Sequence, residues 1–324
     1  MKKTLFFFLV LSLNYVLISF IVFLFSYISL TNGKTYDFFW VKSIQEKLYL
    51  RGLRNIWQHN SDCVKFDKGL LYVPADGECQ FENPEFSTSL NFKDGIRKSK
   101  TNIEFSEKKD SVALLGDSIG MGWGVNDDQT FAYHLEKISN KKIYNLAVSS
   151  YGTVREIKKL LSSNIYDKVD TIIIQYHAND LFENKYLKIN DSYTEDDFKK
   201  KFDKEATKLN KTVFFLKTFK TSLRLFFADI FDRVNPSANV YHVDFKEHSE
   251  YLEKLILENL KFSKKRIIVV YIKEPNMKIH NFPKSNKNIE YLLLPLVKED
   301  FFIIDEHPNV NGHEEIAKKI NSIL

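Results

Sequence analysis

The sequence predicts an α/β protein, with a parallel sheet covered by helices on both faces and one membrane-spanning helix in front of it. Three observations predict this architecture. Short, nearly continuous apolar segments recur after residue 110, segments with helical periodicity separate them, and a long uncharged apolar run stands near the N-terminus. Strands that are buried on both faces have continuous apolar sequences, and their alternation with helices is typical of parallel sheets.

The N-terminal run predicts an uncleaved membrane anchor over residues 1–31. The 26 residues from Leu5 to Leu30 carry no charge, and as a helix they would reach about 39 Å, more than the ~30 Å hydrocarbon core of a bilayer. A secretory signal has a shorter apolar region and an Ala-x-Ala-like cleavage site, which is missing here. Because Lys2 and Lys3 precede the run, we expect a single-pass protein with residues 32–324 on the exported side, periplasmic or extracellular.

The overall composition excludes several classes of protein. Hydrophobic residues make up 44% and charged residues 27% of the chain, which excludes intrinsic disorder. The 47 Lys and Arg against 42 Asp and Glu give a net charge of +5, spread along the chain, so nothing indicates a nucleic-acid partner. Two cysteines and histidines without metal-ligand spacing predict no metal site and no other cofactor.

Residues 32–108 are expected to form an irregular, β-leaning lead-in region, which packs on the main domain that follows it. Within it, Cys63 and Cys79 flank a predicted strand and a turn. In an oxidising compartment this pair is expected to form a disulfide that closes a short loop, worth about 3 kcal/mol. Two free, buried thiols are the alternative.

Residues 109–324 are expected to form the main domain. Its expected strands are Ser111–Leu115, Lys142–Val148, Thr171–Tyr176, Arg266–Ile272 and Phe301–Asp305. Helices are expected at Thr130–Ile138, after an N-cap at Thr153, and at Gly312–Leu324. A long, mostly helical insertion is expected between the third and fourth strands, at about 181–263.

Polar residues follow the strands, where a parallel sheet builds its ligand site. Asp117 and Ser118 come after the first strand, Ser149 to Gly152 after the second, His177 to Asp180 after the third, and Asp305 and His307 at the end of the fifth. Together these residues supply a nucleophile, a base, a group that orients the base, and oxyanion donors. Acyl transfer needs these parts.

The same residues resemble the SGNH or GDSL hydrolase family. Leu115-Gly-Asp-Ser118 is similar to the family's first block, Asn179-Asp180 to its third, and Asp305-Glu-His307-Pro to its fifth. The resemblance covers about 110–324 without the insertion. It implies a flavodoxin-like three-layer α/β/α fold, with Ser118 as nucleophile and His307 as base. It also implies an oxyanion hole made by the Ser118 amide, an amide of the second block and the Asn179 side chain.

The sequence departs from the family pattern at three places. Ser150 stands where the second block has a glycine, and Gly152 is the alternative source of that amide. His177 replaces a glycine two residues before Asn179, where it is expected to fill the pocket wall or tune access, a second base being the alternative. Asp305 lies two residues before His307 instead of three, so either Asp305 orients the imidazole or Glu306 assists.

Several functions remain open from the sequence. The leading hypothesis is a membrane-anchored, exported serine esterase acting on acyl esters, expected to be O-acetyl groups of cell-surface polysaccharide. An O-acyltransferase using the same Ser118 acyl-enzyme is the first alternative. A non-catalytic, anchored binding or assembly protein is the second.

Overall fold

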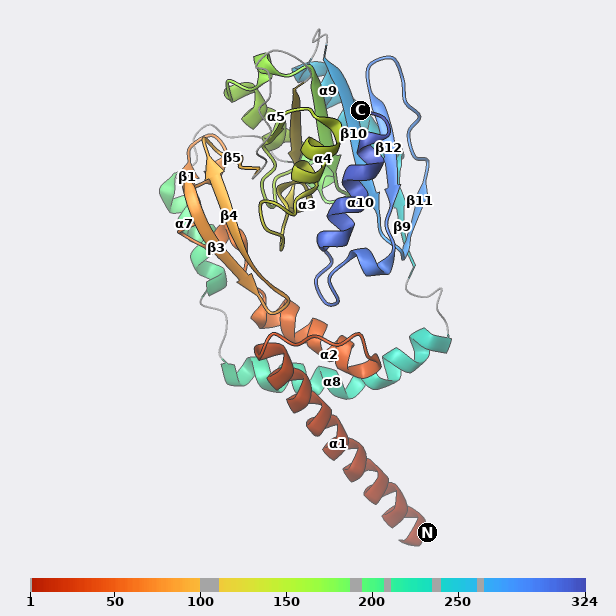
Figure 1. Ribbon diagram of the computed structural model, residues 1–324. Coiled ribbons are helices and arrows are strands. Elements are labelled where there is room, and N and C mark those ends of the chain that lie inside the picture. The colour runs from red at the N-terminus through yellow and green to blue at the C-terminus, as the bar shows by residue number, and fades with distance from the viewer. Residues whose placement is uncertain (1, 100–110, 187–193, 207–210, 235–239, 261–264) are drawn as a thin grey trace.

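A computed structural model describes residues 2–99, 111–186, 194–206, 211–234, 240–260 and 265–324. Its largest element is an eight-stranded sheet with the order β12-β10-β8-β6-β7-β5-β4-β3 (Figure 1). The parallel strands are β6 (Val112–Gly116), β7 (Ile143–Asn145), β8 (Thr171–Tyr176), β10 (Arg266–Lys273) and β12 (Glu290–Pro295). Taken in chain order, these five strands lie as 2-1-3-4-5, the flavodoxin-like arrangement, which confirms the predicted fold class.

Helices cover both faces of the parallel sheet, as expected. α4 (Phe131–Ser139) and α10 (Val310–Asn321) pack on one face, and α5 (Thr153–Ser162) and α9 (Phe245–Asn259) on the other. Side chains along β6 alternate between the two cores, so that Val112 joins the first and Ala113 the second. Because helices cover both faces of the sheet, every position of this strand is buried, which explains its continuous apolar sequence.

The predicted strand at Phe301–Asp305 is wrong. These residues form a loop with one isolated bridge, between Phe301 and Pro308, and the fifth parallel strand is β12. The apolar run misleads because Ile304, its most buried apolar residue, packs among Trp40 and Tyr49 from the lead-in region instead of in the sheet. A short apolar run cannot by itself be told from a strand. The expected N-cap at Thr153 is also one residue late, since Gly152 holds that position.

The lead-in region begins with helical elements and continues as strands. Its elements are α2 (Phe39–Leu48), the π-helical turn η1 (Tyr49–Leu53), the 3-10 turn η2 (Trp57–His59), and strands β1 (Val64–Asp67), β2 (Leu71–Pro74), β3 (Gly77–Asn83), β4 (Phe86–Lys93) and β5 (Ile96–Arg97). Strands β3 to β5 extend the main sheet in antiparallel fashion. Cys63 and Cys79 form the predicted disulfide, with their Cα atoms 5.3 Å apart, so the alternative of two free thiols is wrong.

The insertion is mostly helical where the structure describes it. It contains α6 (Asp180–Tyr186), α7 (Glu195–Ala206), α8 (Lys211–Val234) and the short strand β9 (Tyr241–Asp244), which pairs with β11 (Met277–His280) after β10. The domain boundary expected at 108/109 and the insertion's end at 263 lie outside the described residues.

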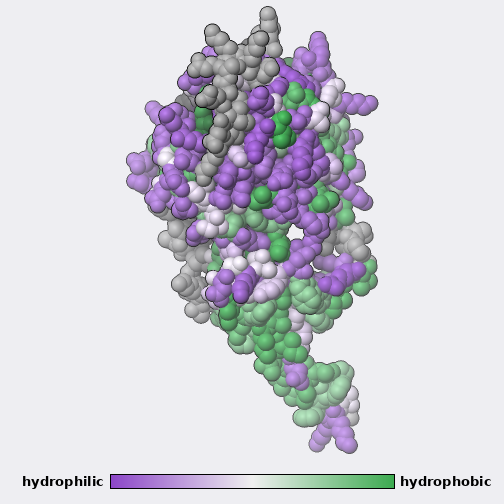
Figure 2. Space-filling view, viewed as in Figure 1, coloured by the Kyte–Doolittle hydropathy of each residue, from purple (hydrophilic) through white to green (hydrophobic). Residues whose placement is uncertain are grey.

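One long helix, α1 (Lys2–Thr31), projects away from the sheet, and α2 and α8 lie across the end where it meets the body (Figure 1). Among the described residues it is the one helix whose length and composition suit a membrane anchor or a signal sequence. Its apolar surface continues onto the underside of the body, whereas most of the rest of the visible face is hydrophilic (Figure 2).

Candidate active site

Ser118 lies directly after β6, as the first residue of the short helix α3 (Ser118–Met121). The turn before it needs a glycine: Gly116 has a φ of +156°, and a Cβ there would lie 2.8 Å from the Oε1 atom of Gln175. Asp117 caps the helix, since its Oδ1 accepts the N–H of Ile119 at 2.9 Å. Gln175 then accepts the N–H of Gly120 at 2.8 Å. These bonds fix the backbone that carries the Ser118 hydroxyl.

Ser118, His307 and Asp305 form one hydrogen-bonded chain. The Oγ atom of Ser118 lies 2.7 Å from Nε2 of His307, and Nδ1 of that imidazole bonds to Oδ1 of Asp305. The same Oδ1 accepts the backbone N–H of His307 at 3.1 Å. A carboxylate only accepts hydrogen bonds, so Nδ1 carries the proton and Nε2 can accept the Ser118 hydroxyl hydrogen. The tight turn brings Asp305 to the imidazole, while the Glu306 side chain lines the neighbouring pocket.

Three further side chains surround the buried carboxylate of Asp305. Tyr49 donates its hydroxyl to Oδ2, the indole Nε1 of Trp123 donates to the same oxygen at 3.1 Å, and Nε of Arg54 lies 3.8 Å away. Burial acts to raise the pKa of Asp305, but His307, Arg54 and the Tyr49 hydroxyl outweigh it and hold this pKa below its usual range. Burial, and then the charge of Asp305, raise the pKa of Tyr49, which keeps it a donor. The carboxylate therefore stays ionised beside the imidazole.

Glu85 positions the loop that carries Asp305. It lies at the tip of the β3–β4 hairpin, and its carboxylate accepts the backbone N–H groups of Ile303, Ile304 and Asp305 at 2.8, 3.0 and 2.8 Å. Burial raises the pKa of Glu85, and the three donated bonds oppose that rise. The loop after β12 is thus held by a side chain from the lead-in region instead of by a strand ladder.

Ser150, in the loop after β7, has an unusual backbone conformation, with a φ of +62°. Nη2 of Arg155 donates to its carbonyl oxygen at 2.5 Å, and Nε2 of Gln58 donates to its hydroxyl at 2.8 Å. Within the described part of the chain, no group accepts the backbone N–H of Ser150. The N–H of Gly152, in contrast, donates to Oε2 of Glu183 at 2.9 Å. Of the two amides that the sequence left open, the Ser150 amide is the one still available.

A buried ion pair between Arg155 and Glu183 supports the loop that contains Ser150. Nε and Nη2 of Arg155 each lie 2.8 Å from an oxygen of Glu183, and both side chains are nearly inaccessible to solvent. The guanidinium also lies over the rings of Tyr151 and Tyr72, with its Cζ 4.5 and 5.5 Å from their centroids. The pair therefore holds both the Ser150 carbonyl and the Gly152 amide.

Asn179 follows β8, whereas the Ser150 loop follows β7, and these two strands flank β6, the strand that leads to Ser118. The Oδ1 atom of Asn179 lies 2.9 Å from Nδ1 of His177, so the ring and the amide are hydrogen-bonded to each other. This contact leaves the Nδ2 group of Asn179 without a bond inside the described residues. His177 lines the pocket beside it, at the position where a wall-filling residue was expected.

One pocket of about 470 Å³ joins these residues. The residues that line it come from the segments after β6, β7, β8 and β10, the His307 loop, the lead-in region and the β9–β11 pair: Arg54, Ile56, Gln58, Asp117, Ser118, Ile119, Trp123, Ser149, Ser150, His177, Ala178, Asn179, Tyr241, Glu274, Met277, Glu306 and His307. The segments that the sequence predicted for the site thus meet at one pocket. No group of three or more His, Cys, Asp or Glu side chains suited to a metal ion occurs among the described residues.

Comparisons with known proteins give a weak likeness in fold. No protein-family model matches the chain, and no curated protein matches it either. Among solved structures, a protein assigned to the G-D-S-L lipolytic family from Desulfitobacterium hafniense aligns at 10% identity and a TM-score of 0.36, over 67% of this chain and 100% of that one.

Two esterases align in a similar way. A two-domain esterase active on acetylated mannans aligns at 13% identity and a TM-score of 0.34, over 67% of this chain and 49% of that one. An acetyl xylan esterase from the rumen bacterium Butyrivibrio proteoclasticus aligns at 12% and 0.33, over 69% of this chain and 65% of that one. This chain thus spans about half and just under two thirds of these two proteins, and the likeness assigns it no activity.

Sequence reasoning missed the residues that support the site from the lead-in region. Tyr49, Arg54 and Glu85 all lie more than 200 positions before His307, and none of them belongs to a recognisable motif. Trp123 was also passed over, although its ring stacks on the imidazole with centroids 4.9 Å apart. Its place only five residues after Ser118, in the same glycine-rich loop, was the one local signal that could have found it.

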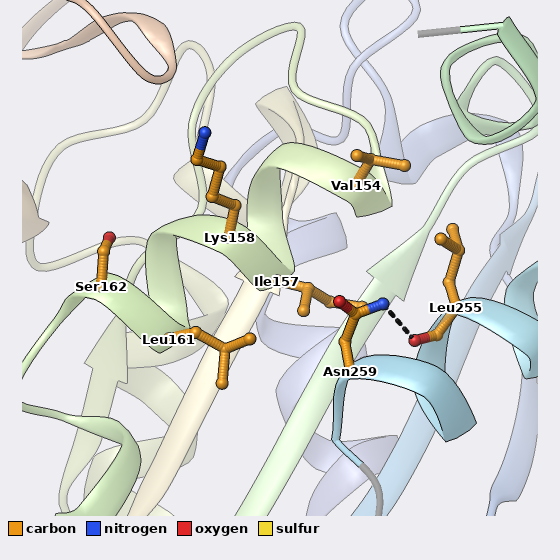
Figure 3. A pocket seen from close by; sticks show the side chains of 7 residues that line it. All are labelled: Val154, Ile157, Lys158, Leu161, Ser162, Leu255 and Asn259. Carbon is orange, nitrogen blue, oxygen red and sulfur yellow. Dashed lines mark hydrogen bonds between the residues drawn. The ribbon is translucent and has the colours of Figure 1, made fainter. Parts of the chain in front are cut away.

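A second pocket, of about 420 Å³, lies between α5 and α9 (Figure 3). Val154, Ile157, Leu161 and Leu255 give it a mostly apolar lining. Asn259 at its edge donates from Nδ2 to the carbonyl oxygen of Leu255 at 2.8 Å, which closes the helix turn. None of the residues predicted for catalysis lines this pocket.

Proposed function

We propose that this protein is a serine ester hydrolase of the SGNH or GDSL type, with Ser118 as the nucleophile that forms the acyl-enzyme. The observation that carries the proposal is the distance of 2.7 Å between Ser118 Oγ and His307 Nε2, in an imidazole whose other nitrogen bonds to Asp305. A serine hydroxyl is a weak nucleophile until a base takes its proton, and this geometry supplies that base together with the group that orients it.

The reaction proceeds in two halves. His307 takes the proton of the Ser118 hydroxyl as the oxygen attacks the ester carbonyl, and then gives that proton to the departing alcohol. Water next attacks the acyl-enzyme and loses a proton to His307, which gives that proton to Oγ of Ser118 as the acid leaves. Asp305 stabilises the imidazolium in both halves, because its lowered pKa keeps it ionised.

The oxyanion is proposed to bind three donors: the amides of Ser118 and Ser150 and Nδ2 of Asn179. Two features support this set. Both amides are free of other acceptors within the described residues, and Ser118, Ser150 and Asn179 line one pocket. Gly152 is not included, because its amide is bonded to Glu183. Loss of one such donor typically slows turnover by about 10²–10³.

The substrate is proposed to be an acyl ester, such as an O-acetyl group, on a cell-surface polysaccharide. Two features support an exported site held at a membrane: the long apolar helix α1 behind Lys2 and Lys3, and the disulfide Cys63–Cys79, a bond that persists in oxidising compartments. The pocket offers polar groups, among them Gln58, that could bind sugar hydroxyls.

Hydrolysis of p-nitrophenyl acetate by the full-length protein in detergent tests the proposal. Ser118→Ala and His307→Ala are expected to abolish turnover, and Asn179→Ala to reduce it by about 10²–10³. Circular dichroism controls for folding. Unchanged turnover in folded Ser118→Ala would overturn the proposal. If sustained release of p-nitrophenol requires an added sugar acceptor and the acetyl group is recovered on that sugar, the acyl-enzyme passes its acyl group to a hydroxyl and the protein is an O-acyltransferase.

A further inference from the structure

Helix α8 is attached to α1 and α2 through one of its faces. The indole Nε1 of Trp40 donates to the carbonyl oxygen of Ser222 at 3.0 Å, and the hydroxyl of Tyr15 donates to the carbonyl oxygen of Leu223. Ser222 is fully buried. One of the two acidic residues of α8, Asp229, is bonded to Ser43 of α2 at 2.7 Å. This face is therefore an internal interface.

The face of α8 beside this interface is apolar and basic, and Phe227, which contacts Tyr15 of α1, lies at its edge. Its large apolar side chains are exposed, Phe227 to 61% and Leu216 to 60%, and the full set is Leu216, Phe227, Ile230, Phe231 and Val234. Three exposed cations lie among them, Lys217, Lys220 and Arg224. Within the described residues none of the three cations forms an ion pair. An exposed surface of this composition fits a membrane interface with anionic lipids.

Contacts between α8 and α1 show where along α1 this face of α8 lies. The Phe215 ring packs on Phe23 and the Phe227 ring on Tyr15, with centroids 4.7 and 5.4 Å apart. Residues 2–14, which precede these contacts, would reach only about 20 Å along α1, which is short of the ~30 Å hydrocarbon core. If α1 crosses a bilayer, its span must include the stretch against which α8 packs.

We propose that α8 is a second membrane-contacting element, which lies in the lipid interface beside α1 and inserts the face formed by Leu216, Phe227, Ile230, Phe231 and Val234. The proposal rests on the membrane anchoring by α1 included in the proposed function. The mostly apolar surface that continues from α1 onto the underside of the body supports a lipid surface as the occupant (Figure 2). Lys217, Lys220 and Arg224 would then face anionic headgroups.

This arrangement would hold the active site close to the bilayer. The turn η1 packs in the same cluster as α8, and its first residue, Tyr49, donates to Asp305. Arg51 of the same turn donates to Thr221 of α8 at 2.8 Å. The layer that rests on the lipid is thus also the layer that contacts the catalytic loop, which restricts the pocket to esters presented near the membrane.

Depth-dependent quenching of a fluorescent label tests the proposal. Four single cysteines would be introduced into the full-length protein: at Leu216 and Phe227 on α8, at Leu9 on α1 as the anchor control, and at Ile138 on α4 as the solvent control. All four side chains are exposed, and the two native cysteines are tied in a disulfide. Each NBD-labelled protein is reconstituted into vesicles of phosphatidylcholine and phosphatidylglycerol, with and without nitroxide-bearing lipid.

The labels at 216 and 227 are expected to lose about half of their emission to the nitroxide lipid, as a group inserted about 5–10 Å below the headgroups would. The label at 138 should lose almost none. Quenching at 9 without quenching at 216 and 227 would overturn the role of α8 and leave the anchor intact. No quenching at 9 would refute the anchor itself. A blue-shifted label at 227 that lipid does not quench would mean that a protein partner covers the face, which also overturns the proposal.

A charge variant provides the matched control. Lys217→Gln, Lys220→Gln and Arg224→Gln together leave the apolar face unchanged. Raising the phosphatidylglycerol content should increase the quenching at 227 in the parent protein, and this increase should disappear in the triple variant. An equal increase in both proteins would contradict a role for these three cations.

Discussion

Tyr49 donates its hydroxyl hydrogen to Oδ2 of Asp305, although the two residues lie 256 positions apart in the sequence. The other oxygen of the same carboxylate receives the Nδ1 hydrogen of His307. The lead-in region therefore supports the candidate active site and is more than a spacer between α1 and the main domain.

Tyr49→Phe is expected to lower kcat of ester hydrolysis about ten-fold and to leave KM nearly unchanged. The change removes one hydrogen bond to a buried carboxylate, and such bonds are worth about 1.5–3 kcal/mol. Steady-state kinetics with p-nitrophenyl acetate measure the effect. Tyr36→Phe, an exposed tyrosine near α1, is the matched control. Equal rates in wild type and folded Tyr49→Phe would show that this hydroxyl does not position Asp305.

Asp305→Asn should lower kcat by about 10³–10⁴, because the amide no longer fixes the tautomer or stabilises the imidazolium of His307. Glu306→Gln should stay within about two-fold of wild type, since its side chain lines the pocket without a bond to the imidazole. Both variants keep the size of the side chain, so the same assay compares them directly. A larger loss in Glu306→Gln than in Asp305→Asn would assign the orienting role to Glu306.

Because of His313, the free energy of unfolding is expected to decrease at acid pH. This fully buried imidazole of α10 accepts the N–H of Phe131 at 3.1 Å, and burial, with a smaller contribution from nearby Arg97, lowers its pKa from 6.5 to about 3. Between these two pH values the unfolded chain binds one proton more than the folded chain. The free energy of unfolding therefore falls as pH decreases below about 6.5, by up to about 1.4 kcal/mol per pH unit.

His313→Gln keeps an acceptor for Phe131 but cannot take up the proton. Thermal unfolding at pH 7 and pH 5 should show a smaller loss of Tm in this variant than in the wild type. Histidines that are partly exposed, such as His134, contribute equally to both proteins and cancel. Parallel loss of Tm in the two proteins would mean that His313 does not titrate on unfolding.

Local sequence was enough to propose the parts of the candidate site that depend on strand ends. Ser118 follows a strand that is buried on both faces, and His307 lies three residues before an amphipathic helix. Both residues could therefore be placed from the local sequence, without distant contacts. The loop before His307 could not be predicted, because Ile304 is buried against Tyr49 and Trp40 and not in the sheet. β12 was missed although Tyr291 to Leu294 form a continuous apolar run, because a short apolar run does not by itself identify a strand.

The supporting contacts of Asp305 are invisible in a single sequence for a similar reason. Glu85 binds three backbone amides of the loop, and a surface-type glutamate at the tip of a hairpin carries no local sign of that role. Only the antiparallel extension of the sheet by β3 and β4 brings it to the loop. Such long-range contacts depend on the fold as a whole.

The central claim is that Ser118 is a nucleophile activated by His307, and covalent labelling tests it most directly. A fluorophosphonate probe is added to the full-length protein, and the modified residue is identified by peptide mass spectrometry. One adduct per chain, on Ser118, is expected, with loss of labelling in Ser118→Ala and slow labelling in His307→Ala. An adduct on another residue, or labelling of folded Ser118→Ala at the wild-type rate, would contradict the account.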